Sequence, residues 1–172
     1  MISKKVCVIG DFAVGKSSLI RRYVLNDFSS DYQATLGVNI YKFSDDVARP
    51  NGGTEALNLI IWDIEGGEPN GGKIETYLQG AAGAIVVGDI TRQDPFKAMI
   101  GHATQFEKLR PGRPIVFAIN KIDLLDGPPD AAQGNTLAEQ FGTQAVYTSA
   151  ADGTAVPDLF RTLGARILQT GA

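Results

Sequence analysis

The fold is decided by the stretch Gly10-Asp11-Phe12-Ala13-Val14-Gly15-Lys16-Ser17, which has the pattern G-x-x-x-x-G-K-S. It follows the apolar run 6–9 and opens the amphipathic stretch 18–25, so it joins a strand to a helix, as this motif requires. The glycines let consecutive backbone N–H groups turn inward, and the helix N-terminus adds partial positive charge. Lys16 supplies a full charge for the β- and γ-phosphates of a nucleotide, and the Ser17 hydroxyl is a ligand for Mg²⁺. The pattern therefore predicts a phosphate-binding loop, against the alternative of a glycine-rich turn without a ligand. The predicted nucleotide contacts in this loop are Asp11, Phe12, Ala13, Val14, Gly15, Lys16, Ser17 and Ser18.

Length and composition are those of an ordinary globular α/β protein. The chain has 172 residues, of which 44% are apolar and 20% charged, so we expect one domain over residues 1–172. Its net charge of −3 argues against a nucleic-acid partner, because such proteins concentrate lysine and arginine on one face. The single cysteine, Cys7, has no partner for an internal disulfide, and no apolar run approaches the length of a membrane span. These features predict a cytoplasmic protein.

Apolar runs and helical periodicity alternate along the chain. The expected strands are 6–9, 38–43, 56–63, 84–89, 115–119 and 145–148, and the expected helices are 18–25, 73–79, 94–109, 135–141 and 156–168. The second and third strands read as a hairpin with a long loop over 44–55. The pattern predicts the α/β fold of a P-loop NTPase, with a mostly parallel six-stranded sheet, one antiparallel edge strand and helices on both faces. Ligands of such a sheet bind at the carboxyl ends of the strands, where Asp63, Asn120 and Thr148 fall.

The stretch Asn120-Lys121-Ile122-Asp123 predicts recognition of guanine. The two carboxylate oxygens of Asp123 can accept from the ring N–H and the exocyclic amino group of guanine, whereas adenine presents an acceptor at that ring nitrogen. Asn120 can stabilise the loop and touch the base edge, and the aliphatic stem of Lys121 can cover the ring plane. Taken alone this four-residue pattern is weak, and a polar strand end followed by a turn is the alternative.

Together these residues resemble the Ras superfamily of small GTPases, most closely its Rab-like branch. The resemblance covers nearly the whole chain and keeps the order of five motifs. They are Lys5 through Ser18, Tyr32 to Gly37 around Thr35, Trp62-Asp63 with Gly66, Asn120-Lys121-Ile122-Asp123, and Thr148-Ser149-Ala150.

The resemblance implies GTP or GDP with Mg²⁺ as ligands and gives further residues a role. Thr35 would ligate Mg²⁺ and contact the γ-phosphate, and Asp63 would hold Mg²⁺ through water. The Gly66 N–H would bind the γ-phosphate, Phe28 would pack against the base, and Ser149 and Ala150 would contribute backbone groups at the guanine. The implied metal site is Ser17, Thr35 and Asp63, and the implied catalytic residues are Lys16, Thr35, Gly66 and Gly67.

The chain departs from the family pattern in four places. Where the family usually has Thr-Ala-Gly-Gln, this chain has Ile64-Glu65-Gly66-Gly67, so the glutamine that positions the attacking water is missing. The bulky Phe12 stands where a small residue is usual, and Ala151 replaces a frequent lysine. Residues 168–172 contain no cysteine to prenylate, so we expect no lipid anchor and no autonomous membrane attachment.

The main prediction is a guanine-nucleotide switch that hydrolyses GTP slowly, with an effector protein as partner in the GTP state and an exchange factor and a GTPase-activating protein as regulators. The alternative is a GTP-binding interaction module with little or no hydrolysis. A nucleotide kinase would need an arginine-rich lid, which the sequence does not show. Glu65 or Glu68 is a candidate replacement for the glutamine, although a carboxylate beside a triphosphate is disfavoured. We interpret His102 as a bystander and Arg21 and Arg22 as a solvated face.

Overall fold

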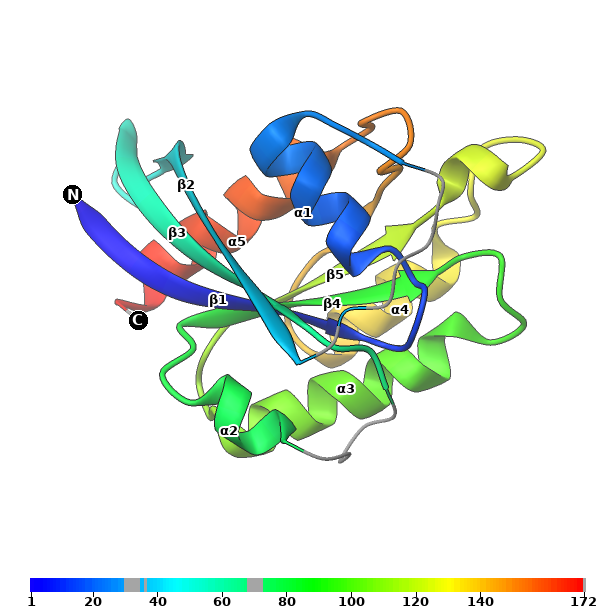
Figure 1. The fold of residues 1–172 in the computed structure, drawn as a ribbon, viewed down its shortest axis with the longest axis horizontal. Helices are drawn as coiled ribbons and strands as arrows, with labels where there is room; N and C mark the ends of the chain where they lie inside the picture. Colours follow the sequence, from blue (N-terminus) through cyan, green and yellow to red (C-terminus); the bar gives the residue numbers. More distant parts are fainter. Residues whose placement is uncertain (30–34, 36, 68–72, 172) are drawn as a thin grey trace.

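The computed structural model describes residues 1–29, 35, 37–67 and 73–171. In this part of the chain a central sheet has the strand order β2-β3-β1-β4-β5-β6 (Figure 1). The strands are β1 (Ile2–Gly10), β2 (Val38–Ala48), β3 (Thr54–Ile64), β4 (Gly83–Asp89), β5 (Ile115–Asn120) and β6 (Ala145–Tyr147). The helices are α1 (Lys16–Leu25), α2 (Ile74–Leu78), α3 (Pro95–Leu109), α4 (Ala132–Gln140) and α5 (Val156–Thr170), with a short 3₁₀ helix at Ile122–Leu124.

The sheet confirms the predicted fold class. β1 lies in parallel between β3 and β4, and β4, β5 and β6 continue the parallel pairing. β2 alone runs antiparallel, at the edge of the sheet, paired with β3. Every residue of β4 and β5 is buried, as expected for strands covered on both faces.

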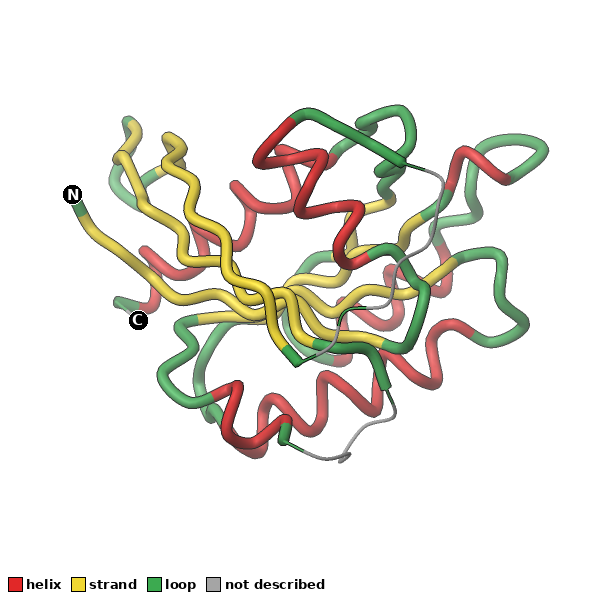
Figure 2. The backbone as a smooth tube through the Cα atoms, viewed as in Figure 1, coloured by secondary structure: helices red, strands yellow, loops and turns green. Residues whose placement is uncertain are grey.

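Alternating residues of the strands face two separate layers of the core. One layer packs against α1 and α5, and includes Val6 and Val8 of β1. The other packs against α2, α3 and α4, and includes Cys7 and Ile9. Figure 2 shows the strands in the middle of the molecule with helices on both sides. All parallel strands therefore end at one edge, where the loops that follow them gather.

The hairpin of β2 and β3 is longer than predicted. Its strands pair from Val38 with Ile64 to Ala48 with Thr54, so the connecting loop is only 49–53. The expectation of a loop over 44–55 was wrong because residues 44–46 have the composition of a turn, yet they pair with β3. α4 also begins three residues earlier than predicted, at Ala132. At α3 the predicted N-cap is confirmed, because Asp94 accepts a hydrogen bond from the Lys97 N–H.

Asp45 fastens this hairpin to two helices. Its Oδ2 accepts from the Tyr23 hydroxyl of α1 at 2.7 Å and from Arg161 Nε of α5 at 2.8 Å. The Tyr23 ring stacks on Phe160 with centroids 4.2 Å apart. Partial burial opposes ionisation of Asp45, but the hydrogen bonds from Arg161 and Tyr23 hold its pKa below the usual value. The carboxylate therefore stabilises the fold in its charged form.

Asp45→Asn is expected to lower the free energy of unfolding by about 1–2 kcal/mol at pH 7, because the amide cannot accept the three hydrogen bonds as a charged group. The folded pKa of Asp45 is depressed, so its contribution is present above the unfolded pKa of about 4 and disappears as pH falls through the lower folded pKa. Urea unfolding across this pH range measures the difference. An equal difference between wild type and variant at pH 2 and pH 7 would contradict the assignment.

Candidate nucleotide-binding site

Hydrogen bonds to its carbonyl groups hold the backbone of the phosphate loop, residues 10–15, in place. In the described structure, each carbonyl oxygen of residues 10–15 accepts a hydrogen bond, and the N–H groups of residues 11–15 have no protein acceptor. The donors are Lys16 Nζ to Gly10 and Asp11 (3.1 and 2.7 Å), Arg92 Nη2 to Phe12, Lys121 Nζ to Ala13 (2.7 Å), Asn120 Nδ2 to Val14 (3.0 Å) and Leu19 N to Gly15 (2.9 Å). In a trans peptide the N–H points opposite to the carbonyl group. The loop is therefore held with its N–H groups available to an anion, as predicted.

Two glycines of this loop are required by close approach. Gly15 has a φ of 105°, and a Cβ there would lie 2.2 Å from Asn120 Nδ2. Gly10 has a φ of 154°, and a Cβ there would lie 2.6 Å from the carbonyl oxygen of Val87. Side chains at either position would push the loop away from the strands that hold it.

Lys16 lies under the loop and is buried, with 6% of its surface exposed. Burial lowers the pKa of its amine to about 8, although Asp63 and Asp11 raise it in part. A bound polyphosphate would favour the charged form of this amine. Lys16 therefore places a buried amine against the phosphate loop, and its role as the phosphate countercharge stays a prediction.

Three oxygen side chains converge at the start of α1. The Ser17 hydroxyl lies 2.5 Å from Asp63 Oδ2 and 2.9 Å from Thr35 Oγ1, which is itself 3.4 Å from Asp63 Oδ2. Asp63 is fully buried, and burial raises its pKa. Its Oδ1 atom has no hydrogen-bond partner among the described residues. Two hydroxyls and a buried carboxylate with a free oxygen fit a hard cation such as Mg²⁺.

Gly66 and Gly67 have very different surroundings. A Cβ at Gly66 would lie 2.9 Å from Lys16 Nζ, 2.9 Å from the Asp11 carbonyl oxygen and 2.8 Å from Phe12 Cα, so this backbone lies directly on the phosphate loop. A Cβ at Gly67 would have no heavy atom within 4 Å. A side chain is therefore excluded at the first position and has room at the second.

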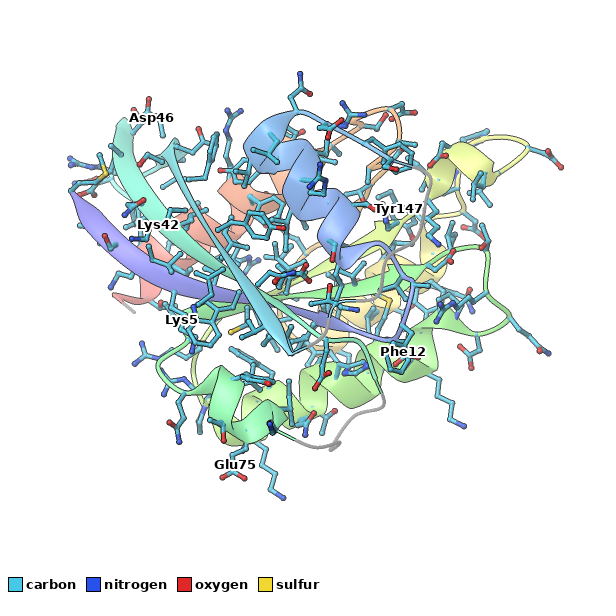
Figure 3. The ribbon with its side chains drawn as sticks, viewed as in Figure 1. Lys5, Phe12, Lys42, Asp46, Glu75 and Tyr147 are labelled. Carbon is cyan, nitrogen blue, oxygen red and sulfur yellow. The ribbon has the colours of Figure 1, made fainter. Side chains whose placement is uncertain are left out.

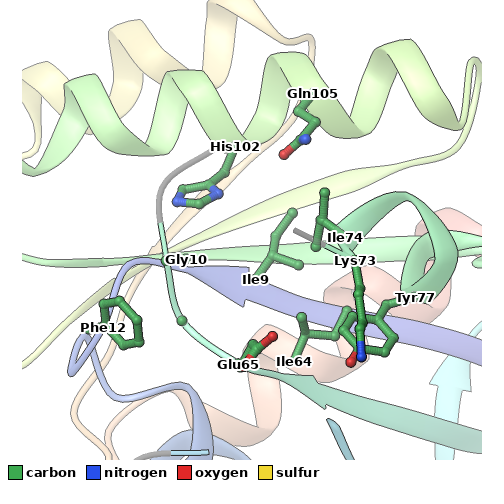
Figure 4. A pocket seen from close by; sticks show the side chains of 12 residues that line it. Ile9, Gly10, Phe12, Ile64, Glu65, Lys73, Ile74, Tyr77, His102 and Gln105 are labelled. Carbon is green, nitrogen blue, oxygen red and sulfur yellow. The ribbon is translucent and has the colours of Figure 1, made fainter. Parts of the chain in front are cut away.

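A cavity of about 280 Å³ lies beside these glycines, between the phosphate loop, the end of β3 and helices α2 and α3 (Figure 4). Phe12 lines one side of it and is 57% exposed at the tip of the loop (Figure 3). His102 of α3 also lines it (Figure 4). The ring of Phe12 therefore lines the same cavity as Gly66 and Gly67, and its effect on the γ-phosphate stays a prediction.

The residues predicted to read the base lie at the ends of β5 and β6. Asn120 donates to Val14 and accepts from the Thr148 hydroxyl at 3.0 Å, so its amide joins the phosphate loop to the base-reading loop. Lys121 has a left-handed φ of 71° and also contacts Asp89 Oδ2 at 3.0 Å. These contacts bear out the loop-stabilising role predicted for Asn120.

A carboxylate completes this end of the site. Asp123 Oδ1 accepts from the Ser149 hydroxyl at 2.8 Å, which leaves its other oxygen without a protein hydrogen bond in the described structure. Phe28, just after α1, is 37% exposed and its N–H donates to Asp27 Oδ1, so its predicted packing against the base stays a prediction. The structure thus brings together a carboxylate, a buried loop around Ala150 and the phosphate loop.

Glu65 is already engaged with the segment before β2. Its Oε2 accepts from the Gly37 N–H at 3.2 Å, and its own N–H donates to the Gly37 carbonyl at 2.8 Å. Because the Glu65 carboxylate already accepts this hydrogen bond, the contact argues against Glu65 as the replacement for the missing glutamine. Glu68, the other candidate, lies outside the described residues, as does Tyr32 in the motif around Thr35.

Two interpretations from the sequence were wrong. His102 is not a bystander, because its Nε2 lies 2.8 Å from Asp11 Oδ1 and the side chain is buried. Arg22 is not part of a solvated face, because it donates to the carbonyls of Ala150 and Ala151 at 2.8 and 2.7 Å. Arg92, which binds Phe12, was missed altogether. These partners lie 80 or more positions away in the chain, and no local spacing indicates them.

Comparison with known proteins gives consistent matches. The sequence profile described as "Ras family" matches residues 5–169. The chain is 37% identical over 159 residues to the Ras-related protein RABA5e of Arabidopsis thaliana, covering 91% of this chain and 70% of that protein. It is 35% identical over 177 residues to the Ras-related protein Rab-32C of Dictyostelium discoideum, with 98% and 75% covered. It is 36% identical over 174 residues to the Ras-related protein Rab-32 of Sus scrofa, with 95% and 74% covered.

The contrast between the two glycines gives a paired test. Gly66→Ala is expected to weaken binding of a nucleoside triphosphate by roughly tenfold or more, because the new methyl group displaces Lys16 Nζ or the loop backbone. Gly67→Ala, the matched control, should leave affinity within about twofold. Displacement of a fluorescent nucleotide measures both variants. Equal losses in the two would show that the approach of Gly66 to the phosphate loop does not matter for binding.

Proposed function

Since this chain belongs to the Ras superfamily as a Rab-like small GTPase, we propose that it is a switch that binds GTP and GDP with Mg²⁺ and hydrolyses GTP slowly. The observation that carries the proposal is the convergence of Ser17, Thr35 and Asp63 beside the phosphate loop. Thr35 lies 18 positions after Ser17 in the sequence, so a ligand that engages its hydroxyl would couple this position to the phosphate loop. This is how a γ-phosphate can change the surface of the protein.

The residues of the site divide the work of binding. The N–H groups of residues 11–15 and the amine of Lys16 hold the β- and γ-phosphates. Ser17, Thr35 and Asp63 would hold Mg²⁺, which would supply positive charge to neutralise the phosphates. Asp123 reads the donor groups of the guanine. Asn120 keeps the two ends of the site in register through its contacts with Val14 and Thr148.

We expect slow hydrolysis because no described side chain near Gly66 is placed to orient the attacking water. Gly67 has no side chain to orient a water molecule, and Glu65 is held by Gly37. These features also favour the second candidate, a GTP-binding interaction module with little or no hydrolysis. The two are separated by the rate of a single turnover of bound GTP.

The partners we propose are those of a nucleotide switch. An effector protein would bind the GTP state, and an exchange factor and a GTPase-activating protein would act on the site. The net charge of −3 gives no support to a nucleic-acid partner.

Across the described residues, no helix has the length and apolarity needed to span a membrane. Cys7 is a buried free thiol whose pKa burial raises to about 12, and from this we propose a reducing, cytoplasmic location.

Guanine selectivity tests the base site. Wild type is expected to prefer GDP over ADP by on the order of 10³-fold or more, because adenine leaves the Asp123 carboxylate unpaired. Asp123→Asn should move the preference toward xanthosine diphosphate, whose carbonyl needs a donor where guanine has an amino group. Competition against a fluorescent GDP analogue measures all three nucleotides. Comparable wild-type affinity for ADP would overturn the proposal.

Restoring the missing side chain tests catalysis. Gly67→Gln is expected to raise the single-turnover rate of GTP hydrolysis by about tenfold or more, because the position has room and the amide can orient water. Adding Phe12→Gly should raise it further, since the ring stands beside the same space. Chromatography of the nucleotide over time gives the rates. Fast hydrolysis by wild type that Gly67→Gln leaves unchanged would mean that another residue positions the water.

A further inference from the structure

We propose that Arg22 is a positioning residue for guanine recognition. It fixes the two peptide groups that join residues 150, 151 and 152, so that the N–H group of Ala151 faces the 6-oxo group of the base beside the N–H group of Ala150. The inference rests on the proposed function, because it concerns how the same site selects its nucleotide. It assigns to a residue of α1, outside the base-reading motifs, a part in specificity.

All three nitrogens of the Arg22 guanidinium have fixed partners. Nε donates to the Ala150 carbonyl at 2.8 Å, Nη2 to the Ala151 carbonyl at 2.7 Å, and Nη1 to Asn26 Oδ1 at 3.2 Å. The aliphatic stem lies against Gly153, where a Cβ would be 3.6 Å from Arg22 Cδ. A planar guanidinium with three partners cannot rotate freely, so α1 and the loop after β6 are joined at a set distance.

These contacts determine where the loop N–H groups point. Because carbonyl and N–H are opposed in a trans peptide, holding the Ala150 carbonyl turns the Ala151 N–H away from Arg22. Holding the Ala151 carbonyl likewise turns away the N–H of Asp152, which meets Ser149 Oγ at 3.1 Å. The Ala150 N–H is directed by its own peptide group, whose Ser149 carbonyl accepts from the Gly153 N–H at 2.8 Å.

Two donors of this loop are left without a protein partner. Within the described residues, the N–H groups of Ala150 and Ala151 have no acceptor in hydrogen-bond reach, although Ala150 is only 3% exposed. A buried donor without an acceptor is costly, and it points to a ligand atom that accepts there. Asp123, an acceptor, belongs to the same site through its bond to Ser149.

This arrangement of donors and acceptor matches guanine and opposes adenine. Guanine offers an acceptor at O6 and donors at N1 and the 2-amino group, whereas adenine places an amino donor at position 6. The Ala151 N–H, which Arg22 orients, would read O6 together with the Ala150 N–H, and Asp123 would read the donors. Ser149 is itself held by backbone bonds to Thr154 and Gly153, so the effect of Arg22 is confined to the 6-oxo side. Ala151 supplies only backbone here, and its orientation comes from the arginine.

The test compares the affinities of GDP, 6-thioguanosine diphosphate and inosine diphosphate at pH 7, each measured by displacement of a fluorescent GDP analogue. 6-Thioguanosine diphosphate keeps both donors but replaces O6 by sulfur, a weak acceptor. Inosine diphosphate keeps O6 but lacks the 2-amino group. The variant is Arg22→Lys, which keeps the charge but cannot span two carbonyls with a rigid fork. The matched control is Arg21→Lys, on the same helix, whose guanidinium pairs with the exposed Asp27 at 2.7 Å.

In wild type, the sulfur substitution is expected to weaken binding roughly tenfold or more. In Arg22→Lys this penalty should fall to less than about threefold, because the Ala151 N–H is no longer aimed at O6, while the inosine penalty stays as in wild type. Arg21→Lys should keep both penalties. Since each penalty is a ratio within one protein, general destabilisation cancels. Equal loss of affinity for all three ligands in Arg22→Lys would make Arg22 merely structural and overturn the inference. A wild type that does not prefer GDP to ADP would instead overturn the proposed function, and this inference with it.

Discussion

The hydrogen bonds that hold the carbonyl groups of residues 10–15 outward are the interaction on which the rest of the site depends. Their donors come from α1, from the loop after β4 and from the loop after β5, so the phosphate loop has its shape only when these elements are in place. Asn120 and Lys121 each make such a bond, so residues next to Asp123, for which we propose a role in reading the base, also support the phosphate loop. The proposed base end and phosphate end of the site therefore belong to one connected framework.

This framework exists because of the order of the strands. β1 lies between β3 and β4, so the end of β3 with Asp63 and the end of β5 with Asn120 lie on either side of the phosphate loop. The two core layers keep the sheet rigid from both faces, and Asp45 fastens the exposed hairpin to α1 and α5. The chemistry is then placed at the carboxyl edge, where polar groups do not disturb the core.

The sequence predicted the fold, and it predicted the strand ends at which several candidate site residues lie, for reasons that are local. Buried parallel strands read as continuous apolar runs, and the phosphate loop, Asp63 and Asn120 each follow one directly. Thr35 was expected only through the family resemblance, because its own surroundings have no pattern. The extended hairpin was missed because Asp45 resembles a turn residue until Tyr23 and Arg161 are seen beside it. Contacts such as those of Arg22 and His102 join positions 128 and 91 residues apart, and helical periodicity cannot distinguish them from exposed polar residues.

The contact of Arg22 gives helix α1 a second role as a spacer. The helix begins at Lys16, beside the phosphate loop, and carries Arg22 six positions later, which corresponds to about 9 Å along its axis. Helix α1 thus fixes the distance between the phosphate loop and the loop after β6. A residue inserted or deleted between these positions would rotate Arg22 by about 100° around the helix and separate it from the loop, whatever the inserted residue was. The constraint on this segment is therefore on its length, while the identity of a solvent-facing residue such as Arg21 is free to vary.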